Sequence, residues 1–173
     1  YALGIEHGDE VITTTFTFVA TANAILMQGA TPIFVDIEPI TYNIDPKKIE
    51  EKITKNTKAI LPVDLYGHIF DVPRIKKIAH TYKLALIEDA CQAHGAAFKN
   101  KKAGGIGDVG CFSFYATKNM TTGEGGMLVT NSKKITELAR EFRHHGQSQN
   151  TRYRYNCLGF NYRLTDIQAA IGL

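Results

Sequence analysis

One lysine stands out in the stretch "CFSFYATKNMTTGEGG" (residues 111–126), because it follows an apolar run with the pattern of a buried strand. An amine that reacts covalently must lose its proton, which partial burial or nearby cations favour. It must also be held by rigid elements, and a strand end followed by a glycine-rich turn provides them. Lys118 is therefore a candidate for Schiff-base chemistry, although an ordinary solvated lysine at a strand end would have the same local sequence.

The run before Lys118 carries a hydroxyl group on one of its two faces. Side chains alternate along a strand, so the two phenylalanines of "CFSFY" point to one side. The other side carries Cys111, Ser113 and Tyr115. Ser113 is the polar member of a face that is otherwise suited to packing, which makes it a second candidate for the same site.

A carboxylate ends the apolar run "LALIED", residues 84–89. Asp89 is followed by small residues in "EDACQAHGA", which also contains Gln92 and His94. Small residues leave room for a planar ligand, and a carboxylate held there can keep a ring nitrogen protonated. The same position would also suit an aspartate that only caps a following helix, so both interpretations stand.

The threonine-rich run "TTTFTFVATANA", residues 13–24, is a further candidate. Threonine hydroxyls near the start of a helix can donate hydrogen bonds to a phosphate group, and Phe18 could lie against a planar ring. Alternatively, the run is an ordinary helix start and Phe18 is a core aromatic.

Two other patterns are interpreted without chemistry. The run "GIGDVG", residues 105–110, matches G-x-G-x-x-G, but the dinucleotide fingerprint must open a helix and this run leads into a strand. We interpret it as a turn. His144 and His145 are adjacent and cannot both face one ion on a helix, so no metal site is predicted.

Composition limits the class of protein. The 173 residues are 44% hydrophobic and 21% charged with a net charge of +3, which is typical of one soluble domain. No run of about 18 apolar residues is present, so we predict no membrane segment. The stretch "RHHGQSQNTRYRYN" mixes arginine with tyrosine, but no second basic stripe supports a nucleic-acid partner. Three cysteines without a C-x-x-C pair favour buried thiols in the cytoplasm.

The elements that must position these residues alternate between strands and helices. This alternation predicts a parallel, doubly wound α/β sheet whose last strands are mixed. Ligands gather at the carboxyl ends of such strands, so Asp64, Asp89 and the segment 113–118 should meet at one edge. Strands are predicted at residues 10–14, 32–37, 57–65, 84–89, 109–115 and 125–130. Helices are predicted at 17–29 with Gly29 as C-cap, 43–53 with Asp45 as N-cap, 71–83, and 132–145 with Ser132 as N-cap.

Taken together, the motifs resemble the DegT/DnrJ/EryC1/StrS family of pyridoxal-phosphate-dependent sugar aminotransferases. The resemblance covers nearly the whole chain, in the blocks "GDEVITTTFTFVATANAI", "GATPIFVDIEPITYNIDP", "TKAILPVDLYG", "IEDACQAHGA", "GDVGCFSFYATKNMTTGEGGMLVT", "RHHGQS" and "LGFNYRLTDIQAAI". It implies a fold type I, aspartate-aminotransferase-like large domain over residues 1–173. Such a domain is three-layered, with a mostly parallel sheet and helices on both faces.

The resemblance also implies a role for each matching residue. Lys118 matches the lysine that binds the cofactor, pyridoxal 5′-phosphate, covalently and moves protons at the substrate carbon. Asp89 matches the acid that pairs with the pyridine nitrogen, and Gln92 matches the position beside the ring's phenolic oxygen. Ser113 matches the hydroxyl that binds the cofactor phosphate, and Phe18 matches the aromatic side chain that stacks on the ring.

The implied reaction involves a second subunit and two substrates. In "GFNYRLTD" the family places a residue that reaches the phosphate site of the neighbouring subunit, for which Asn161 is the first choice and Arg163 the alternative. A homodimer with shared active sites would transfer an amino group, usually from glutamate, to a keto group of a nucleotide-linked deoxysugar. Pyridoxamine 5′-phosphate is the intermediate form of the cofactor. Two alternatives remain: a sugar dehydratase of the same family, whose members carry His in place of the lysine, and a regulatory protein on this fold.

The chain departs from the family pattern in three places. Relatives usually carry "S-G-T-A-A-L", a phosphate-binding turn, before the helix that ends in "ALGI", and a small domain after the large one. Neither is in the sequence, so we expect a fragment of a longer protein that alone binds cofactor poorly. Relatives also often have His where Asp64 stands in "PVDLYG", a difference that could tune the substrate pocket.

Overall fold

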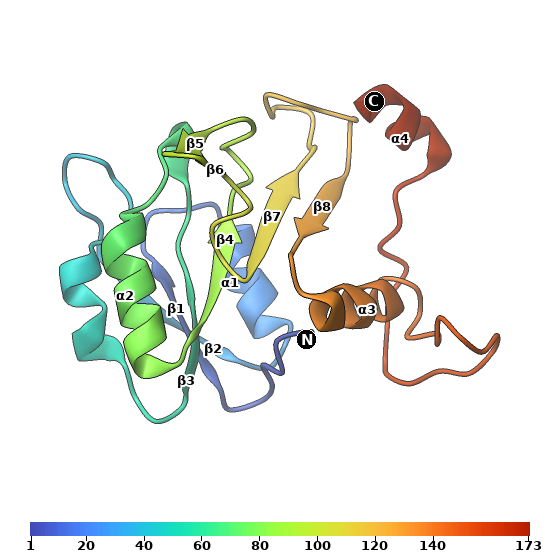
Figure 1. Cartoon of the computed structure of the whole chain (residues 1–173), viewed down its shortest axis with the longest axis horizontal. Helices are drawn as coiled ribbons and strands as arrows, with labels where there is room; N and C mark the ends of the chain where they lie inside the picture. The colour runs from blue at the N-terminus through green and yellow to red at the C-terminus, as the bar shows by residue number, and fades with distance from the viewer.

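A six-stranded sheet forms the centre of the computed structural model, which describes residues 1–173 (Figure 1). The strand order is β2-β1-β3-β4-β7-β8; the first five strands run parallel and β8 is antiparallel to β7. The strands are β1 (Glu10–Thr14), β2 (Thr31–Val35), β3 (Thr57–Leu61), β4 (Ala85–Asp89), β7 (Val109–Ser113) and β8 (Gly126–Val129), and β5 (Ala97–Phe98) and β6 (Lys101–Lys102) pair separately. The predicted mostly parallel sheet with a mixed end is confirmed.

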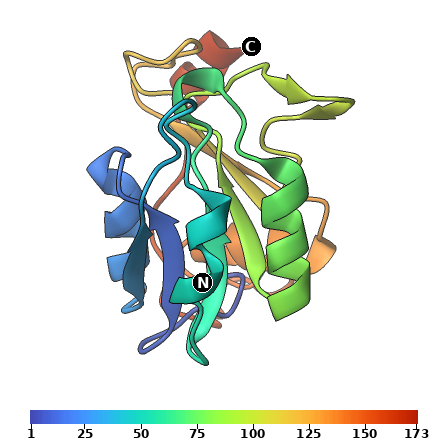
Figure 2. The same cartoon turned by 90° about the vertical axis from the view of Figure 1, so that its left-hand side faces the viewer.

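Helices cover both faces of this sheet, as Figure 2 shows for α1 and α2. The helices are α1 (Val19–Leu26), α2 (Val72–Tyr82), α3 (Lys133–Phe142) and α4 (Asp166–Gly172). Because side chains alternate along each strand, Ile60 and Leu86 pack with Ile75 of α2, whereas Leu61 packs with Ile25 of α1. The two apolar layers on either side of the sheet give the predicted three-layer architecture.

The α-helix predicted for residues 43–53 is wrong, because this segment contains no α-helix. The segment forms two 3-10 turns, η1 (Pro46–Lys48) and η2 (Glu50–Lys52). Asp45 still acts as the N-cap and accepts a hydrogen bond of 2.9 Å from the Lys47 amide. Ile44 and Ile49 are almost completely buried in the core beneath α2, and this packing overrides the helical propensity of the short segment between β2 and β3.

The remaining helix ends differ from the predictions by a few residues. Helix α1 ends at Leu26, and Gly29 follows three residues later with a left-handed φ of 72° instead of capping the helix directly. Ser132 caps α3 as predicted, since its hydroxyl accepts a hydrogen bond of 3.3 Å from the Ile135 amide. None of the helices combines the length and mean hydropathy that crossing a lipid bilayer requires.

Candidate active site

The carboxyl ends of β4 and β7 open into a cavity of about 660 Å³ on the face of the sheet that carries α1. Five of the six predicted site residues line it: Phe18, Asp89, Gln92, Ser113 and Lys118. The alternation predicted for "CFSFY" holds, because Cys111, Ser113 and Tyr115 line the cavity whereas Phe112 packs against an apolar cluster elsewhere. The sheet edge therefore brings together residues that are up to 100 positions apart in the sequence (118 minus 18).

Asp89 is fixed at both its backbone and its side chain. Its amide donates to the Pro62 carbonyl at 3.0 Å, next to the point where β3 ends. One carboxylate oxygen, Oδ2, accepts a hydrogen bond of 2.9 Å from the Thr21 hydroxyl, and Oδ1 accepts one of 3.2 Å from the Cys91 amide. No helix follows Asp89, so the interpretation as a helix cap is wrong. The carboxylate is instead oriented by the cavity wall.

Thr21 is a site residue that the sequence reasoning missed. It is a buried residue of α1, and its hydroxyl also forms a hydrogen bond of 2.9 Å with the Thr17 hydroxyl at the cavity edge. The threonine-rich composition of residues 13–24 was the available signal, but it pointed to a phosphate and not to Asp89. Two threonines one helical turn apart thus form a hydrogen-bonded chain that ends on the carboxylate.

Lys118 lies in the turn after β7 and is half-buried at the cavity. Its backbone amide donates to the Tyr115 carbonyl at 3.0 Å, and the hairpin continues past the strand through the Phe114 amide, which donates to the Gly125 carbonyl at 2.8 Å. None of the ion pairs of the structure involves Lys118. Its amine is therefore available to a ligand.

Ser113 and Phe18 also present free groups. The Ser113 oxygen accepts a hydrogen bond of 3.3 Å from the Tyr115 amide, which leaves its own O–H free to donate. Phe18 precedes α1 with 71% of its surface exposed, so the alternative that it is a core aromatic is wrong. An exposed ring next to a cavity can stack on a planar ligand.

Gln92 is oriented by a neighbouring loop. Its side-chain oxygen Oε1 accepts a hydrogen bond of 2.8 Å from the Tyr66 amide. Tyr66 has a left-handed φ of 52°, an uncommon conformation for a residue with a Cβ atom. With its oxygen engaged, Gln92 offers the N–H groups of its amide to a ligand.

Two cysteines of the cavity wall are poor nucleophiles. Burial, followed by the charge of Asp89, raises the pKa of the Cys91 thiol far above its usual range. Burial and the charges of Asp89 and Glu88 raise the pKa of Cys111 to about 11. Since the thiolate is the reactive form, neither thiol is a ready nucleophile at neutral pH. All three cysteines are free, but each is only partly buried, where the sequence predicts buried thiols.

Asn161 does not line the cavity. It forms an isolated bridge with His144, and its side-chain oxygen accepts a hydrogen bond of 2.8 Å from Arg163 Nε. Arg163 also lies 2.7 Å from His144 Nδ1. Both choices for the residue that reaches a neighbouring subunit thus belong to one cluster, and their expected role stays a prediction.

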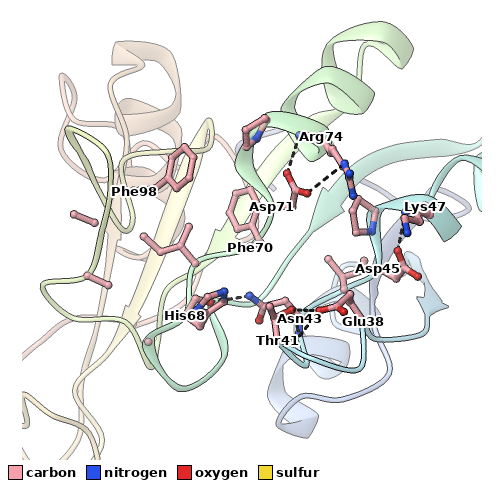
Figure 3. A pocket seen from close by; sticks show the side chains of 17 residues that line it. Glu38, Thr41, Asn43, Asp45, Lys47, His68, Phe70, Asp71, Arg74 and Phe98 are labelled. Carbon is pink, nitrogen blue, oxygen red and sulfur yellow. Dashed lines mark hydrogen bonds and ion pairs between the residues drawn. The ribbon is translucent and has the colours of Figure 1, made fainter.

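A larger cavity of about 810 Å³ lies beside the start of α2 (Figure 3). Its polar side chains mostly serve the local backbone: Asn43 donates to the His68 carbonyl at 2.8 Å, and Asp71 caps α2 by accepting from the Arg74 amide at 3.1 Å. None of the predicted site residues lines this cavity. We therefore assign the chemistry to the smaller cavity, which holds Asp89 and Lys118.

The glycine-rich turn predicted at residues 105–110 donates backbone hydrogen bonds to a buried carboxylate of the same chain. Glu88 accepts hydrogen bonds from the Ile106 amide at 2.9 Å and the Gly107 amide at 3.2 Å. The turn then leads into β7, as predicted from its failure to open a helix. Its amides are thus engaged by Glu88.

Comparison with known proteins shows which proteins this chain is similar to. The DegT/DnrJ/EryC1/StrS aminotransferase family matches residues 1–173. A GDP-perosamine synthase of Caulobacter vibrioides is 49% identical over 99% of this chain and 46% of its own length. A pleiotropic regulatory protein of Geobacillus stearothermophilus is 48% identical over 98% of this chain and 45% of its own length. The ntda protein of Bacillus subtilis, solved with bound cofactor PMP, superposes with a TM-score of 0.92 at 44% identity, covering 99% of this chain and 39% of that one. The chain thus spans about half the length of the relatives it matches.

Proposed function

The chain belongs to the DegT/DnrJ/EryC1/StrS aminotransferase family, and we propose that it is the cofactor-binding large domain of a pyridoxal-phosphate-dependent aminotransferase. The complete enzyme transfers an amino group from an amino acid, glutamate, to a keto group of a nucleotide-linked deoxysugar, for amino-sugar and polysaccharide biosynthesis. It works in the cytoplasm as a homodimer with shared active sites. The free cysteines support the reducing compartment.

One observation carries the proposal. Lys118 and Asp89, the amine and the acid that this chemistry requires, line the same cavity together with Gln92, Ser113 and Phe18. They come from the start of α1, from the end of β4 and its following turn, and from the end of β7 and its following turn, and all five line one cavity large enough for a small ligand. The name of the Caulobacter vibrioides relative, a GDP-perosamine synthase, supports a nucleotide-linked sugar as the acceptor.

The cavity fits the cofactor by the chemistry of its walls. Asp89 is a carboxylate whose orientation is fixed by the Thr21 hydroxyl and the Cys91 amide. Lys118 supplies an amine without an ion-pair partner, and Ser113 supplies a free O–H donor for a phosphate oxygen. Bound pyridoxal phosphate supplies an aldehyde carbon that carries the amino group and a ring that accepts electrons.

Each site residue then has its own role in the proposed reaction. Asp89 holds a proton on the ring nitrogen, and a carboxylate that is fixed by two donors does so without reorganising. Lys118 Nζ takes a proton from the substrate carbon and returns it, as a general base and then a general acid. Gln92 donates an amide N–H to a ring oxygen, and Phe18 covers one face of the ring. Asn161, or Arg163, completes the phosphate site of the neighbouring subunit.

The full-length protein provides the test. Incubation with glutamate and a panel of nucleotide-linked keto-sugars should yield 2-oxoglutarate and an amino sugar, detected by mass spectrometry. Borohydride reduction should attach the cofactor to the peptide that contains Lys118. Lys118→Ala should abolish both results, whereas Lys133→Ala, at an exposed lysine of α3, should leave both unchanged. An unmodified Lys118 peptide, together with full activity of Lys118→Ala, would contradict the proposal.

A regulatory protein is the second candidate function, because the Geobacillus stearothermophilus relative is named a pleiotropic regulatory protein. The presence of Lys118, Asp89 and Ser113 in one cavity favours the enzyme, since a regulator does not need a reactive amine. Lys118 also argues against a sugar dehydratase, whose members carry His there. Cofactor bound to Lys118 without transfer from any amino acid would favour the regulator.

A further inference from the structure

Asp64 is a buried acid with no part in the functions assigned above. It lies after β3 with no exposed surface, and it does not line the cavity, so it does not shape the substrate pocket directly. Its amide donates to the Asp89 carbonyl at 2.9 Å. Asp64 therefore adjoins the strand end that carries the acid of the cavity.

A second buried acid lies next to it. Glu88 has no exposed surface, and its carboxylate accepts hydrogen bonds from three backbone amides. The amides are those of Gly104 at 2.6 Å, Ile106 at 2.9 Å and Gly107 at 3.2 Å. Asp64 has a single donor, the Phe70 amide, which lies 3.1 Å from Oδ1, while its buried Oδ2 has no partner. The Glu88 carboxylate thus has three hydrogen-bond donors, whereas the Asp64 carboxylate has one.

The burial of Asp64 with a single hydrogen-bond donor favours its neutral form. Burial, followed by the charge of Glu88, raises the pKa of Asp64 to about 8, and Asp89 adds a smaller effect. Among the charged groups around this pair, Lys76 of α2 lies near Glu88, and Lys101 of β6 and Asp108 lie near Lys76. Asp64 is therefore mainly a neutral carboxylic acid at neutral pH.

The segment 65–70 connects Asp64 to the cavity. It begins directly after Asp64 and returns to it, because the Phe70 amide at its far end donates to Asp64 Oδ1. Between these points the backbone is left-handed at Tyr66 (φ 52°) and Gly67 (φ 85°). The Tyr66 amide is the group that binds Gln92 Oε1 at 2.8 Å.

Asn43 holds the same segment from the other side. Its side-chain Oδ1 accepts a hydrogen bond of 3.2 Å from the Leu65 amide, and its Nδ2 donates to the His68 carbonyl at 2.8 Å. The Asn43 side chain thus holds the segment at its start and middle, and the Asp64 side chain holds it at its end. Only the acid can change charge.

We propose that Asp64 is a positioning residue: as a neutral carboxylic acid with its proton on Oδ2, it holds segment 65–70 in the conformation that lets the Tyr66 amide orient Gln92. Ionisation of Asp64 places a second negative charge beside Glu88, and the repulsion displaces the Asp64 side chain together with the Phe70 amide that is hydrogen-bonded to Oδ1. The segment then shifts, and the Tyr66 amide no longer holds the Gln92 amide in this orientation. The inference rests on the proposed function only in giving Gln92 a ligand to face.

The matched variants are Asp64→Asn, which keeps the acceptor for the Phe70 amide without a charge, and Asp64→Ala, which leaves that amide unpaired. Stability of the full-length protein without cofactor is measured by chemical denaturation from pH 5 to pH 10. An acid with a raised folded pKa stabilises the fold at low pH and loses this contribution as pH rises to the folded pKa. The folding constant of the wild type relative to Asp64→Asn should therefore fall about tenfold per pH unit up to about pH 8 and then level off. A ratio that is constant over this range overturns the proposal.

A second measurement remains informative if the variants do not fold, because its decisive result comes from the wild type. The infrared spectrum at pH 6.5 should contain the carbonyl band of a protonated carboxylic acid, and this band should disappear as pH is raised past about 8. Absence of any such band at pH 6.5 would overturn the proposal, whereas its loss in Asp64→Asn would assign it.

Cofactor affinity separates positioning from a purely structural role. Asp64→Ala should weaken binding of pyridoxal phosphate about tenfold or more at pH 7, and Asp64→Asn should restore it, because the lost amide interaction is of that size. Equal affinity in wild type and Asp64→Ala would overturn the link to Gln92. If the wild type binds no cofactor, the proposed function fails, while the infrared and stability results still decide the state of Asp64.

Discussion

The Thr21 hydroxyl donates a hydrogen bond of 2.9 Å to Asp89 Oδ2 across 68 positions of sequence. Thr21 is a buried residue of α1, and Asp89 is the last residue of β4. The bond therefore joins the helix on one face of the sheet to the strand end that carries the acid. It leaves the carboxylate one fixed orientation toward the cavity.

Thr21→Val should weaken cofactor binding by roughly tenfold, because a hydrogen bond to a charged group contributes about 1.5–3 kcal/mol and valine has the same shape without the donor. Titration of the full-length protein with pyridoxal phosphate, followed by absorbance, measures the dissociation constant. Thr21→Ser is the control, since it keeps the hydroxyl and should bind nearly as the wild type does. Equal affinities in Thr21→Val and the wild type would show that the bond does not position Asp89.

Cys91 and Cys111 should resist alkylation in the folded protein. Burial raises the pKa of both thiols, to about 11 for Cys111, so few molecules carry a thiolate at pH 8. Iodoacetamide should then label Cys111 roughly a hundredfold more slowly than in the protein unfolded in guanidinium. Mass spectrometry of quenched samples measures the two rates, and the folded rate should rise with pH up to about 11. Equal rates at pH 8 would mean that the thiols are solvated.

The sheet and its functional edge could be predicted from the sequence because short apolar strands alternate with helices. The meeting of Asp89, Ser113 and Lys118 at one cavity follows from the rule that parallel strands present their carboxyl ends on one side. The identity of the chemistry required the family resemblance, because a lysine after a strand has many uses. The sequence alone therefore predicted the location of the site better than its reaction.

Other features could not be read from local patterns. The contacts of Thr21 with Asp89, and of Tyr66 with Gln92, join residues that are far apart in the sequence. The 3-10 turns at residues 46–52 replace the predicted helix because the core buries the isoleucines around them. These features depend on tertiary packing, which a pattern of neighbouring residues does not encode.

Gly107→Ala should destabilise the protein by about 2 kcal/mol or more, because a Cβ atom there would lie 2.5 Å from the Leu86 carbonyl oxygen. The backbone shift needed to relieve this contact would also move the Gly107 amide away from Glu88. Gly105→Ala is the matched control in the same turn, since its added Cβ would meet its nearest atom, the Lys102 carbonyl oxygen, at 3.4 Å. Thermal unfolding of both variants measures the difference, and equal melting temperatures would contradict the packing argument.

Gln92→Glu should distinguish the role of the accepting side-chain oxygen of Gln92 from the role of its donating N–H groups. A glutamate keeps an oxygen for the Tyr66 amide, which Oε1 now binds at 2.8 Å, so the melting temperature should change little. It replaces the N–H donors that face the cavity by a second carboxylate oxygen, which repels an electron-rich oxygen of a ligand. Affinity for pyridoxal phosphate should therefore fall by roughly tenfold at pH 8 and recover partly at pH 5, where the new glutamate begins to take up a proton. Gln92→His is the control, because one ring nitrogen can accept from Tyr66 while the other donates to the ligand. If Gln92→Glu binds as tightly as the wild type at pH 8, the amide does not donate to the cofactor.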